Sequence, residues 1–258
     1  MFSWWQAIIL GIVEGITEFL PISSTGHLIL SSRLLNLPPS EFLTSFEITI
    51  QLGAILAIVA LYWRSLLMNW EIIKRLIVAF IPTALIGLLL YKLIKNVLLG
   101  STTVVLWSLL LGGIILIIFE LLHKEKPQAV NEVGRISYRQ SFIIGLFQSL
   151  AVIPGVSRAA ATIIGGLLLG LRRKTIVEFS FLLAVPTMLA ATGWDLIQSA
   201  SSFSADQFGW LAVGLVVSFV TALVSVKWLL NYIQKNTFVA FGVYRIALAV
   251  FFWWLVIK

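Results

Sequence analysis

Glu14 to Leu30 reads EGITEFLPISSTGHLIL, and this stretch decides the fold. An apolar helix leads into a break at Pro21, and a short apolar segment follows at 25–35. That segment would reach only about 16 Å at about 1.5 Å per residue, whereas the hydrocarbon core of a bilayer is about 30 Å thick. Non-helical backbone at that depth is tolerated only within protein or beside a polar cavity. The stretch therefore predicts a hairpin that enters and leaves the membrane on one side.

A second break, at Pro154-Gly155, precedes another short apolar segment, Ser157 to Gly170, which would reach about 21 Å. It predicts a second hairpin of the same kind. Proline, glycine and charged residues divide the whole chain into ten apolar helical segments, near 4–20, 25–35, 42–63, 76–95, 101–122, 139–153, 157–170, 176–193, 208–230 and 238–257.

The composition indicates a membrane protein. Hydrophobic residues make up 60% of the 258 residues and charged residues only 11%, which is less than half the charged fraction of typical soluble domains. The net charge of +7 falls mostly in short loops, where it indicates topology and contact with anionic lipid rather than nucleic acid. The chain has no cysteine, which excludes disulfides, thiolate metal sites and a cysteine nucleophile. Its first residues do not resemble a cleavable signal.

A weak internal repeat predicts how the segments are arranged. EGITEFLPISS at 14–24 resembles QSLAVIPGVS at 148–157 after a one-residue gap. Each half would hold one re-entrant hairpin and three spanning helices, and an odd number of crossings inverts the second half relative to the first. Basic loops placed in the cytoplasm agree with six crossings, with both termini outside and the hairpin tips meeting near the midplane.

The expected fold class is an all-α polytopic membrane protein with an inverted-topology repeat, six spanning helices and two re-entrant helical hairpins. We expect a single membrane domain over 1–258, with one repeat at about 1–122 and the other at about 138–258. Within it, Glu178 and Arg245 are expected to lie near each other as a structural pair, because an unpaired charge in the membrane is costly.

The first hairpin carries acidic residues, which are unusual in an apolar helix. Glu14 and Glu18 lie four residues apart, on one helical face. Two carboxylates there cost several kcal/mol unless they are paired, protonated or bound to a metal. They are either a structural polar pair or, as intramembrane charges usually are, functional residues.

Beyond the break come Ser23, Ser24, Thr25, Gly26 and His27. Serine and threonine are ordinary helix N-caps at this place. The same position turns free backbone N–H groups and the positive end of the helix toward a cavity, which favours phosphate. A histidine can give or take a proton near neutral pH.

The second hairpin contains PGVSR, which places Ser157 and Arg158 at a helix start. The guanidinium of Arg158 can hold phosphate oxygens in a fork, or form a simple ion pair with Glu14 or Glu18. An arginine and two helix ends attract an anion that two carboxylates would repel, and a divalent cation between carboxylates and phosphates resolves this conflict. The expected cofactor is therefore Mg²⁺ or Ca²⁺ held by Glu14 and Glu18. The expected ligand is a diphosphate with its tail in lipid.

Four blocks of the sequence are distinctive: EGITEFLPISSTGH at 14–27, FEITIQLGAILA at 46–57, YRQSFIIGLFQSLAVIPGVSR at 138–158 and EFSFLLAVP at 178–186. Together they resemble the bacterial undecaprenyl-diphosphate phosphatase family, often called the bacitracin-resistance protein, over essentially the whole chain. The resemblance implies removal of one phosphate from undecaprenyl diphosphate, which recycles the lipid carrier of cell-wall synthesis, with a divalent metal and with resistance to bacitracin. It assigns functional roles to Glu14, Glu18, Ser24, His27, Ser157 and Arg158. Many members have serine where this chain has Ala159.

The expected mechanism is in-line attack on the terminal phosphorus, with Arg158, the helix N-termini and the metal stabilising charge. Ser24 would be the nucleophile, with Glu18 or His27 as its base. Alternatively, water attacks and Ser24 orients the phosphate. The residues expected to bind substrate are Ser23, Thr25, Gly26, Ser157 and Arg158.

The same interpretation predicts location and partners. We expect a multi-pass protein of the bacterial cytoplasmic (inner) membrane with its active site facing outside, a polyprenyl diphosphate lipid substrate, contact with membrane lipid and no nucleic acid. A homodimer is compatible with the sequence. The alternative function is a polyprenyl-phosphate transporter or flippase on the same fold, since inverted repeats are typical of secondary transporters.

Overall fold

The fold is a bundle of helices, seen here in a computed structural model that describes residues 2–90, 101–199 and 205–257. Every regular element in those residues is helical, as expected from the sequence, and ten of them are α-helices. In chain order the helices are α1 (Trp4–Thr17), α2 (Ser24–Leu34), α3 (Glu41–Met68), α4 (Trp70–Leu89), α6 (Thr102–Leu122), η2 (Val133–Arg135), α7 (Tyr138–Ser149), η3 (Leu150–Val152), α8 (Arg158–Leu168), α9 (Arg173–Ser199), α10 (Ala205–Tyr232) and α11 (Val239–Ile257).

One expected boundary is wrong. The sequence predicts a basic loop between segments 42–63 and 76–95, but α3 continues to Met68 and α4 already begins at Trp70. The single residue Asn69 separates the two helices, and its side-chain oxygen accepts a hydrogen bond from the N–H of Ile72 at 3.2 Å. The α3 helix is itself kinked at Tyr62, next to the expected end of the first segment. Long basic side chains at helix ends can extend their charge away from an apolar surface, so charge alone does not end a helix. The end of the second segment, 91–95, lies outside the described residues.

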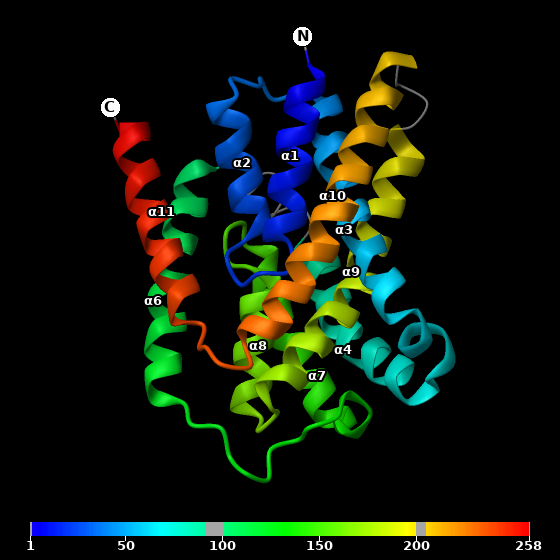
Figure 1. Ribbon diagram of the computed structural model, residues 1–258, viewed down its shortest axis with the longest axis vertical. Helices are drawn as coiled ribbons and strands as arrows, with labels where there is room; N and C mark the ends of the chain where they lie inside the picture. Colours follow the sequence, from blue (N-terminus) through cyan, green and yellow to red (C-terminus); the bar gives the residue numbers. More distant parts are fainter. Residues whose placement is uncertain (1, 91–100, 200–204, 258) are drawn as a thin grey trace.

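The two short helices meet head to head in the middle of the bundle. The loop from α1 to α2 and the loop from α7 to α8 approach each other from opposite ends (Figure 1). Each of α2 and α8 has 11 residues, so each is about 16 Å long. The first turns of both helices therefore lie next to the same central space.

The two halves of the chain repeat the same polar contacts. The side-chain amide of Gln6 in α1 donates to the carbonyl oxygen of Leu35, 29 residues further along, at 3.4 Å. Gln140 in α7 donates to the carbonyl oxygen of Leu169, also 29 residues further along, at 3.0 Å. In each half, one glutamine thus fastens the end of the short helix to the helix that precedes the loop.

Close helix crossings are repeated as well. A side chain on Gly11 of α1 would come within 2.8 Å of an α10 carbonyl oxygen, and one on Gly145 of α7 within 2.0 Å of an α4 carbonyl oxygen. Thr221 of α10 donates to the Gly11 carbonyl at 3.4 Å, and Thr83 of α4 donates to the Gly145 carbonyl at 3.1 Å. The absence of a side chain at each glycine therefore allows a threonine-glycine contact that holds two helices together.

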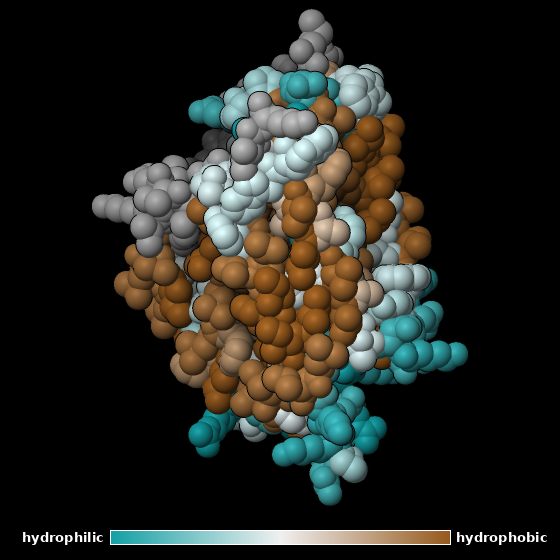
Figure 2. Space-filling view, turned by 90° about the vertical axis from the view of Figure 1, so that its left-hand side faces the viewer, coloured by the Kyte–Doolittle hydropathy of each residue, from teal (hydrophilic) through white to brown (hydrophobic). Residues whose placement is uncertain are grey.

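The surface agrees with a membrane protein. The helices α3, α4, α6 and the Gln207–Tyr232 part of α10 are long and apolar enough to cross a bilayer, among the residues described. Figure 2 shows a broad apolar surface over the middle of the molecule and hydrophilic residues gathered at its lower end. The connections from α3 to α4, α6 to α7, α8 to α9 and α10 to α11 all lie toward that end, away from both termini (Figure 1). We call it the basic end, because its connections and the adjoining helix turns carry Arg64, Lys124, Lys126, Arg135, Arg172, Arg173, Lys174, Lys227 and Lys235.

Candidate active site

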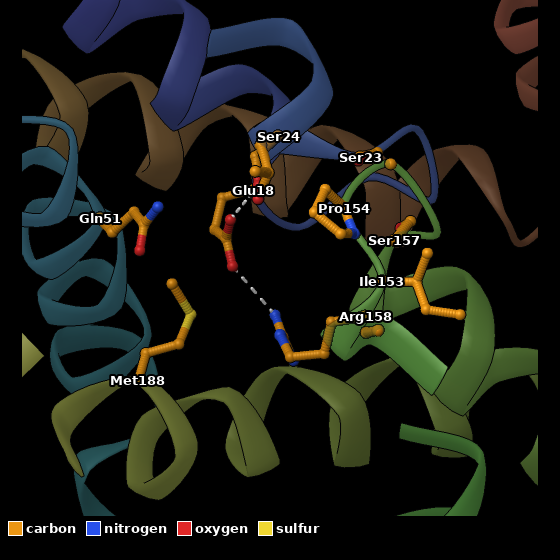
Figure 3. Close-up of a pocket in the computed structure, with 12 residues that line it drawn as sticks. Glu18, Ser23, Ser24, Gln51, Ile153, Pro154, Ser157, Arg158 and Met188 are labelled. Carbon is orange, nitrogen blue, oxygen red and sulfur yellow. Dashed lines mark hydrogen bonds and ion pairs between the residues drawn. The ribbon is translucent and has the colours of Figure 1, made fainter. Parts of the chain in front are cut away.

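A cavity of about 140 Å³ lies where the two loops meet (Figure 3). Both loops, the first turns of α2 and α8, and side chains from α3 and α9 contribute to its wall. The lining residues are Glu18, Ser23, Ser24, Thr25, Gln51, Ala151, Ile153, Pro154, Gly155, Ser157, Arg158 and Met188. Six of the residues expected from the sequence are therefore gathered around one space: Glu18, Ser23, Ser24, Thr25, Ser157 and Arg158.

The cavity contains a continuous line of three polar side chains. The Ser24 hydroxyl donates a hydrogen bond to Oε2 of Glu18, and Oε1 of Glu18 lies 3.3 Å from Nη2 of Arg158 (Figure 3). Nη1 of Arg158 donates to the carbonyl oxygen of Ser180 at 2.8 Å, while its buried Nε has no hydrogen-bond partner among the described residues. The hydroxyl thus lies against a carboxylate, and the guanidinium keeps a donor for another anion.

Ser23 and Ser157 shape the start of the two helices. Each precedes the helix as its N-cap, and its hydroxyl accepts from the N–H three residues on, that of Gly26 at 3.3 Å and that of Ala160 at 3.2 Å. Both have a positive φ, which non-glycine residues rarely adopt. The paired caps aim two positive helix ends and their free N–H groups at the same region.

Glu14 lies behind the cavity wall rather than in it. It belongs to α1, one turn before Glu18, as expected, and its side chain is fully buried. Neither of its carboxylate oxygens has a hydrogen-bond partner in the described structure. The charged groups that act on it are Glu18, Glu47 and Arg158. A buried carboxylate with no donor is costly, so this position suits a cation or a shared proton.

His27 is also held outside the cavity wall. Its Nδ1 is 2.7 Å from the carbonyl oxygen of Ser23, and its Nε2 is 2.8 Å from the hydroxyl of Tyr244, on which the ring also stacks. Because a carbonyl oxygen only accepts, Nδ1 carries a proton, and in the neutral ring Tyr244 donates to Nε2. His27 therefore links the first loop to Tyr244 of α11, whereas Glu18 contacts the Ser24 hydroxyl directly.

The expected pair of Glu178 and Arg245 is wrong. Glu178 lies 4.0 Å from Lys174 at the start of α9, and Arg245 is fully buried among main-chain carbonyl groups. Its guanidinium donates to the carbonyls of Pro21 in the first loop and Gly155 and Val156 in the second, and to Ser108 and Leu109 of α6. Main-chain carbonyl oxygens of the two loops and of α6 satisfy the arginine, so no acid is needed.

Two residues that line the cavity were not predicted from the sequence, one predicted residue lies outside it, and one residue has a role that was not predicted. Gln51 and Met188, opposite the loops, were not predicted, although a glutamine within an apolar helix is a signal that could have indicated Gln51. Gly26 does not line the cavity but packs beneath Ser23. The role of Arg245 needed the fold, because its partners are backbone atoms from three distant segments.

The comparisons with known proteins agree with this geometry. Residues 7–251 match the family described as bacitracin resistance protein BacA. This chain belongs to that family. It is 57% identical over 242 residues to a protein of Aquifex aeolicus named undecaprenyl-diphosphatase, with 94% of each chain covered.

Proteins of the same name from other bacteria have similar sequences. A Sulfurihydrogenibium protein is 51% identical, with 96% of this chain and 97% of the relative covered. A Wolinella succinogenes protein is 51% identical, with 96% of each chain covered. The match to the BacA family spans both loops and every residue that lines the cavity.

Proposed function

We propose that this membrane protein is an undecaprenyl-diphosphatase, which hydrolyses undecaprenyl diphosphate to undecaprenyl phosphate and inorganic phosphate. The line from Ser24 through Glu18 to Arg158 carries the proposal. A hydroxyl held by a carboxylate, beside a guanidinium with a free donor, is what phosphoryl transfer to a serine requires. The family relationship supplies the substrate, and with it the recycling of a cell-wall lipid carrier and resistance to bacitracin.

In the proposed reaction, Ser24 Oγ attacks the terminal phosphorus in line with the bridging oxygen. Glu18 takes the hydroxyl proton, the bond from Oγ to phosphorus forms, and the bond to the bridging oxygen breaks. Undecaprenyl phosphate leaves, and water then releases phosphate from the serine. We favour Glu18 over His27 as the base, because Glu18 accepts the Ser24 hydrogen bond while both His27 nitrogens have other partners.

The charge of the transferred phosphoryl group is stabilised by Arg158 and by the helix ends. Removing one donor of this kind commonly costs about 10²–10³ in rate. Ser23 and Ser157 would bind phosphate through hydroxyl hydrogens, since their oxygens already accept from the helix N–H groups. Thr25 lines the cavity one residue beyond the nucleophile.

We propose that Glu14 and Glu18 would hold a divalent cation. The described part of the chain has no group of three acidic, histidine or cysteine side chains that could hold a metal. Mg²⁺ commonly uses one or two carboxylates and takes its other ligands from water and substrate phosphate. The unpartnered oxygens of Glu14 are consistent with such a site. When bound, the cation would neutralise charge on the diphosphate.

For the membrane arrangement, we propose an inverted-topology repeat with six spanning helices, α3, α4, α6, α9, α10 and α11, and two re-entrant hairpins. The repeated contacts of Gln6 with Leu35 and of Gln140 with Leu169 support the repeat. Basic residues gathered at one end support a cytoplasmic location for that end. The cavity would then open to the outside of the inner membrane.

The test is phosphate release from undecaprenyl diphosphate by the purified protein, with and without a chelator. We expect release with Mg²⁺ or Ca²⁺, none with the chelator, and none from a Ser24→Ala variant that keeps the wild-type unfolding temperature. Acid quenching followed by peptide mass spectrometry should then find phosphate on Ser24. Release by Ser24→Ala at a substantial rate would instead favour attack by water.

Transport of the lipid phosphate is the second candidate function. The matching contacts in the two halves favour it, because repeats that meet at a central site are common in transporters. Folded protein that releases no phosphate with metal present, yet moves a labelled polyprenyl phosphate between vesicle leaflets, would support transport in place of hydrolysis.

A further inference from the structure

A second and larger cavity lies at the basic end, apart from the cavity lined by Glu18, Ser24 and Arg158. Its volume is about 460 Å³, which is within the range of ligand-binding pockets. One wall is the connection after α6, from His123 to Ala129, and the other is the end of α8 with the residues up to Leu171. No residue lines both this pocket and the catalytic cavity.

The connection that forms the pocket is fastened at its far end. The N–H of Val130 donates to the carbonyl of Gly170 at 3.0 Å, and the N–H of Arg172 donates to the carbonyl of Val130 at 2.8 Å. The Arg172 side chain also donates to the carbonyl of Pro127 at 3.3 Å. These bonds tie the connection to the start of α9, so the pocket is a defined feature of the fold.

The pocket combines a basic rim with an apolar wall. Lys124 and Lys126 are exposed, and neither forms an ion pair with a described residue. Glu125 is the single acidic residue in the lining, so the charge of the rim is positive overall. The opposite wall consists of leucines and Gly170, and includes Leu168, which is 58% exposed.

His123 forms the part of the pocket wall nearest to α6. It ends α6, its ring stacks on Phe119 with the ring centres 4.9 Å apart, and it lines the pocket. Its Nε2 is buried and has no hydrogen-bond partner among the described residues. Buried polar atoms are almost always paired, so this nitrogen is an unsatisfied group behind the pocket wall, and the pocket's open space is not what it contacts.

We propose that this pocket binds the phosphate headgroup of an anionic membrane phospholipid. Its position at the basic end places it at the depth of the lipid headgroups, and exposed Leu121, Leu122 and Leu168 lead from it onto the apolar surface. The exposed Lys124 and Lys126 match the charge of the phosphate, and the leucines match the first carbons of an acyl chain. Basic pockets beside membrane helices commonly bind such headgroups.

The site is connected to the catalytic cavity by a single helix. The α8 helix begins with Arg158 in the catalytic cavity and ends with Leu168 in the lipid pocket. A lipid at one end would hold the helix that presents Arg158 at the other. The inference needs only that the protein is embedded in a membrane, and it is tested by binding, which does not depend on the hydrolytic function.

Native mass spectrometry of the purified full-length protein in detergent micelles provides the test. Phosphatidylglycerol, phosphatidylcholine, undecaprenyl phosphate and inorganic phosphate are titrated separately. One pocket variant is the double change Lys124→Gln and Lys126→Gln, and the other, Ala129→Trp, fills the pocket without changing its charge. The matched control is Lys227→Gln with Lys235→Gln, which removes two exposed lysines from the same end of the molecule but outside the pocket.

We expect wild type and the control variant to retain one phosphatidylglycerol, and Ala129→Trp to lose it. The double pocket variant should bind it about 30-fold more weakly, since a basic residue near an anionic headgroup contributes about a factor of five. Equal weakening in the control, equal retention of phosphatidylcholine, tighter binding of undecaprenyl phosphate that Ala129→Trp abolishes, or displacement of the lipid by inorganic phosphate would each overturn the proposal. Retention of the lipid by both pocket variants would do so as well.

Discussion

Ser23 and Ser157 have nearly the same unusual backbone conformation, with φ of 72° and 75° respectively. Each caps the short helix that follows it, and each is followed by a residue of the catalytic line, Ser24 in one loop and Arg158 in the other. The strain of a positive φ on a side-chain-bearing residue, about 1–3 kcal/mol, is therefore found twice at the site. Strain maintained in both halves indicates that the two loops present Ser24 and Arg158 by the same geometry.

Ser23→Gly should stabilise the protein and weaken substrate binding. Glycine removes the strain of the positive φ, and glycine at an N-cap costs only a few tenths of a kcal/mol relative to serine. We expect a rise of about 1 kcal/mol in the free energy of unfolding, with KM raised about tenfold by loss of one hydrogen bond to phosphate. Ser23→Ala, which keeps the strain and loses the cap, should be less stable than wild type. Unchanged KM in the glycine variant would show that the hydroxyl serves only the helix.

Glu14→Gln should lower activity without unfolding the protein. The carboxylate is fully buried and its oxygens have no hydrogen-bond partner among the residues described, so a neutral amide removes a desolvation cost. We expect an unfolding temperature equal to or above that of wild type, together with a higher Mg²⁺ concentration for half-maximal activity. Glu41→Gln, an exposed change at the start of α3, is the control. The same metal titration in both variants would refute a carboxylate-metal site.

Arg158→Lys should remain strongly impaired although it keeps the charge. Arg158 contacts Glu18 with one nitrogen and the Ser180 carbonyl with another, and a single ammonium cannot span both while also reaching phosphate. A fall of about 100-fold or more in kcat is expected from steady-state kinetics. Arg33→Lys at the exposed end of α2 controls for the exchange itself. A wild-type kcat in Arg158→Lys would show that only the positive charge of Arg158 is needed.

Arg245→Lys should loosen both loops at once. Three ammonium hydrogens cannot replace the donors that now serve five carbonyl groups, and each buried carbonyl left unpaired costs about 1–3 kcal/mol. We expect a clear drop in unfolding temperature and a fall in kcat that added guanidinium partly restores in Arg245→Ala. Gly112→Ala gives a second test, since its new Cβ would lie 2.1 Å from Nη2 of Arg245. Normal kcat in both the lysine and the Gly112→Ala variants would show that the loops are held by other contacts.

The helices were predictable because their causes are local. Apolar runs divided by proline, glycine and charged residues give the ten helices, and the two short segments after Pro21 and Pro154-Gly155 already indicate the paired loops. The break at Asn69 was not predictable in this way, since it depends on one side chain capping a helix inside a charged stretch. The length and polarity of a segment predict that a helix forms there. They predict its ends poorly where the helix continues into charged residues.

The composition of the site was predictable, but its internal arrangement was not. Polar residues in an apolar sequence indicate Glu18, Ser24 and Arg158, because membrane burial makes them expensive. The cost of an unpaired charge in the membrane also predicts an acidic partner for Arg245. This prediction is wrong because main-chain carbonyl oxygens bind the guanidinium, and no sequence pattern indicates them. The choice between Glu18 and His27 as neighbour of the nucleophile likewise depends on side-chain directions within a single turn.

The last prediction concerns the side of the membrane from which the site is reached. The chain has no cysteine, so single cysteines report without background. Thr25 lines the catalytic cavity, and Arg172 is exposed at the basic end. Because basic connections stay in the cytoplasm, Thr25→Cys should react with an impermeant thiol reagent added to intact cells, and undecaprenyl diphosphate should protect it. Arg172→Cys should react only after the membrane is opened, and the reverse labelling pattern would overturn the orientation while leaving the chemistry of the loops intact.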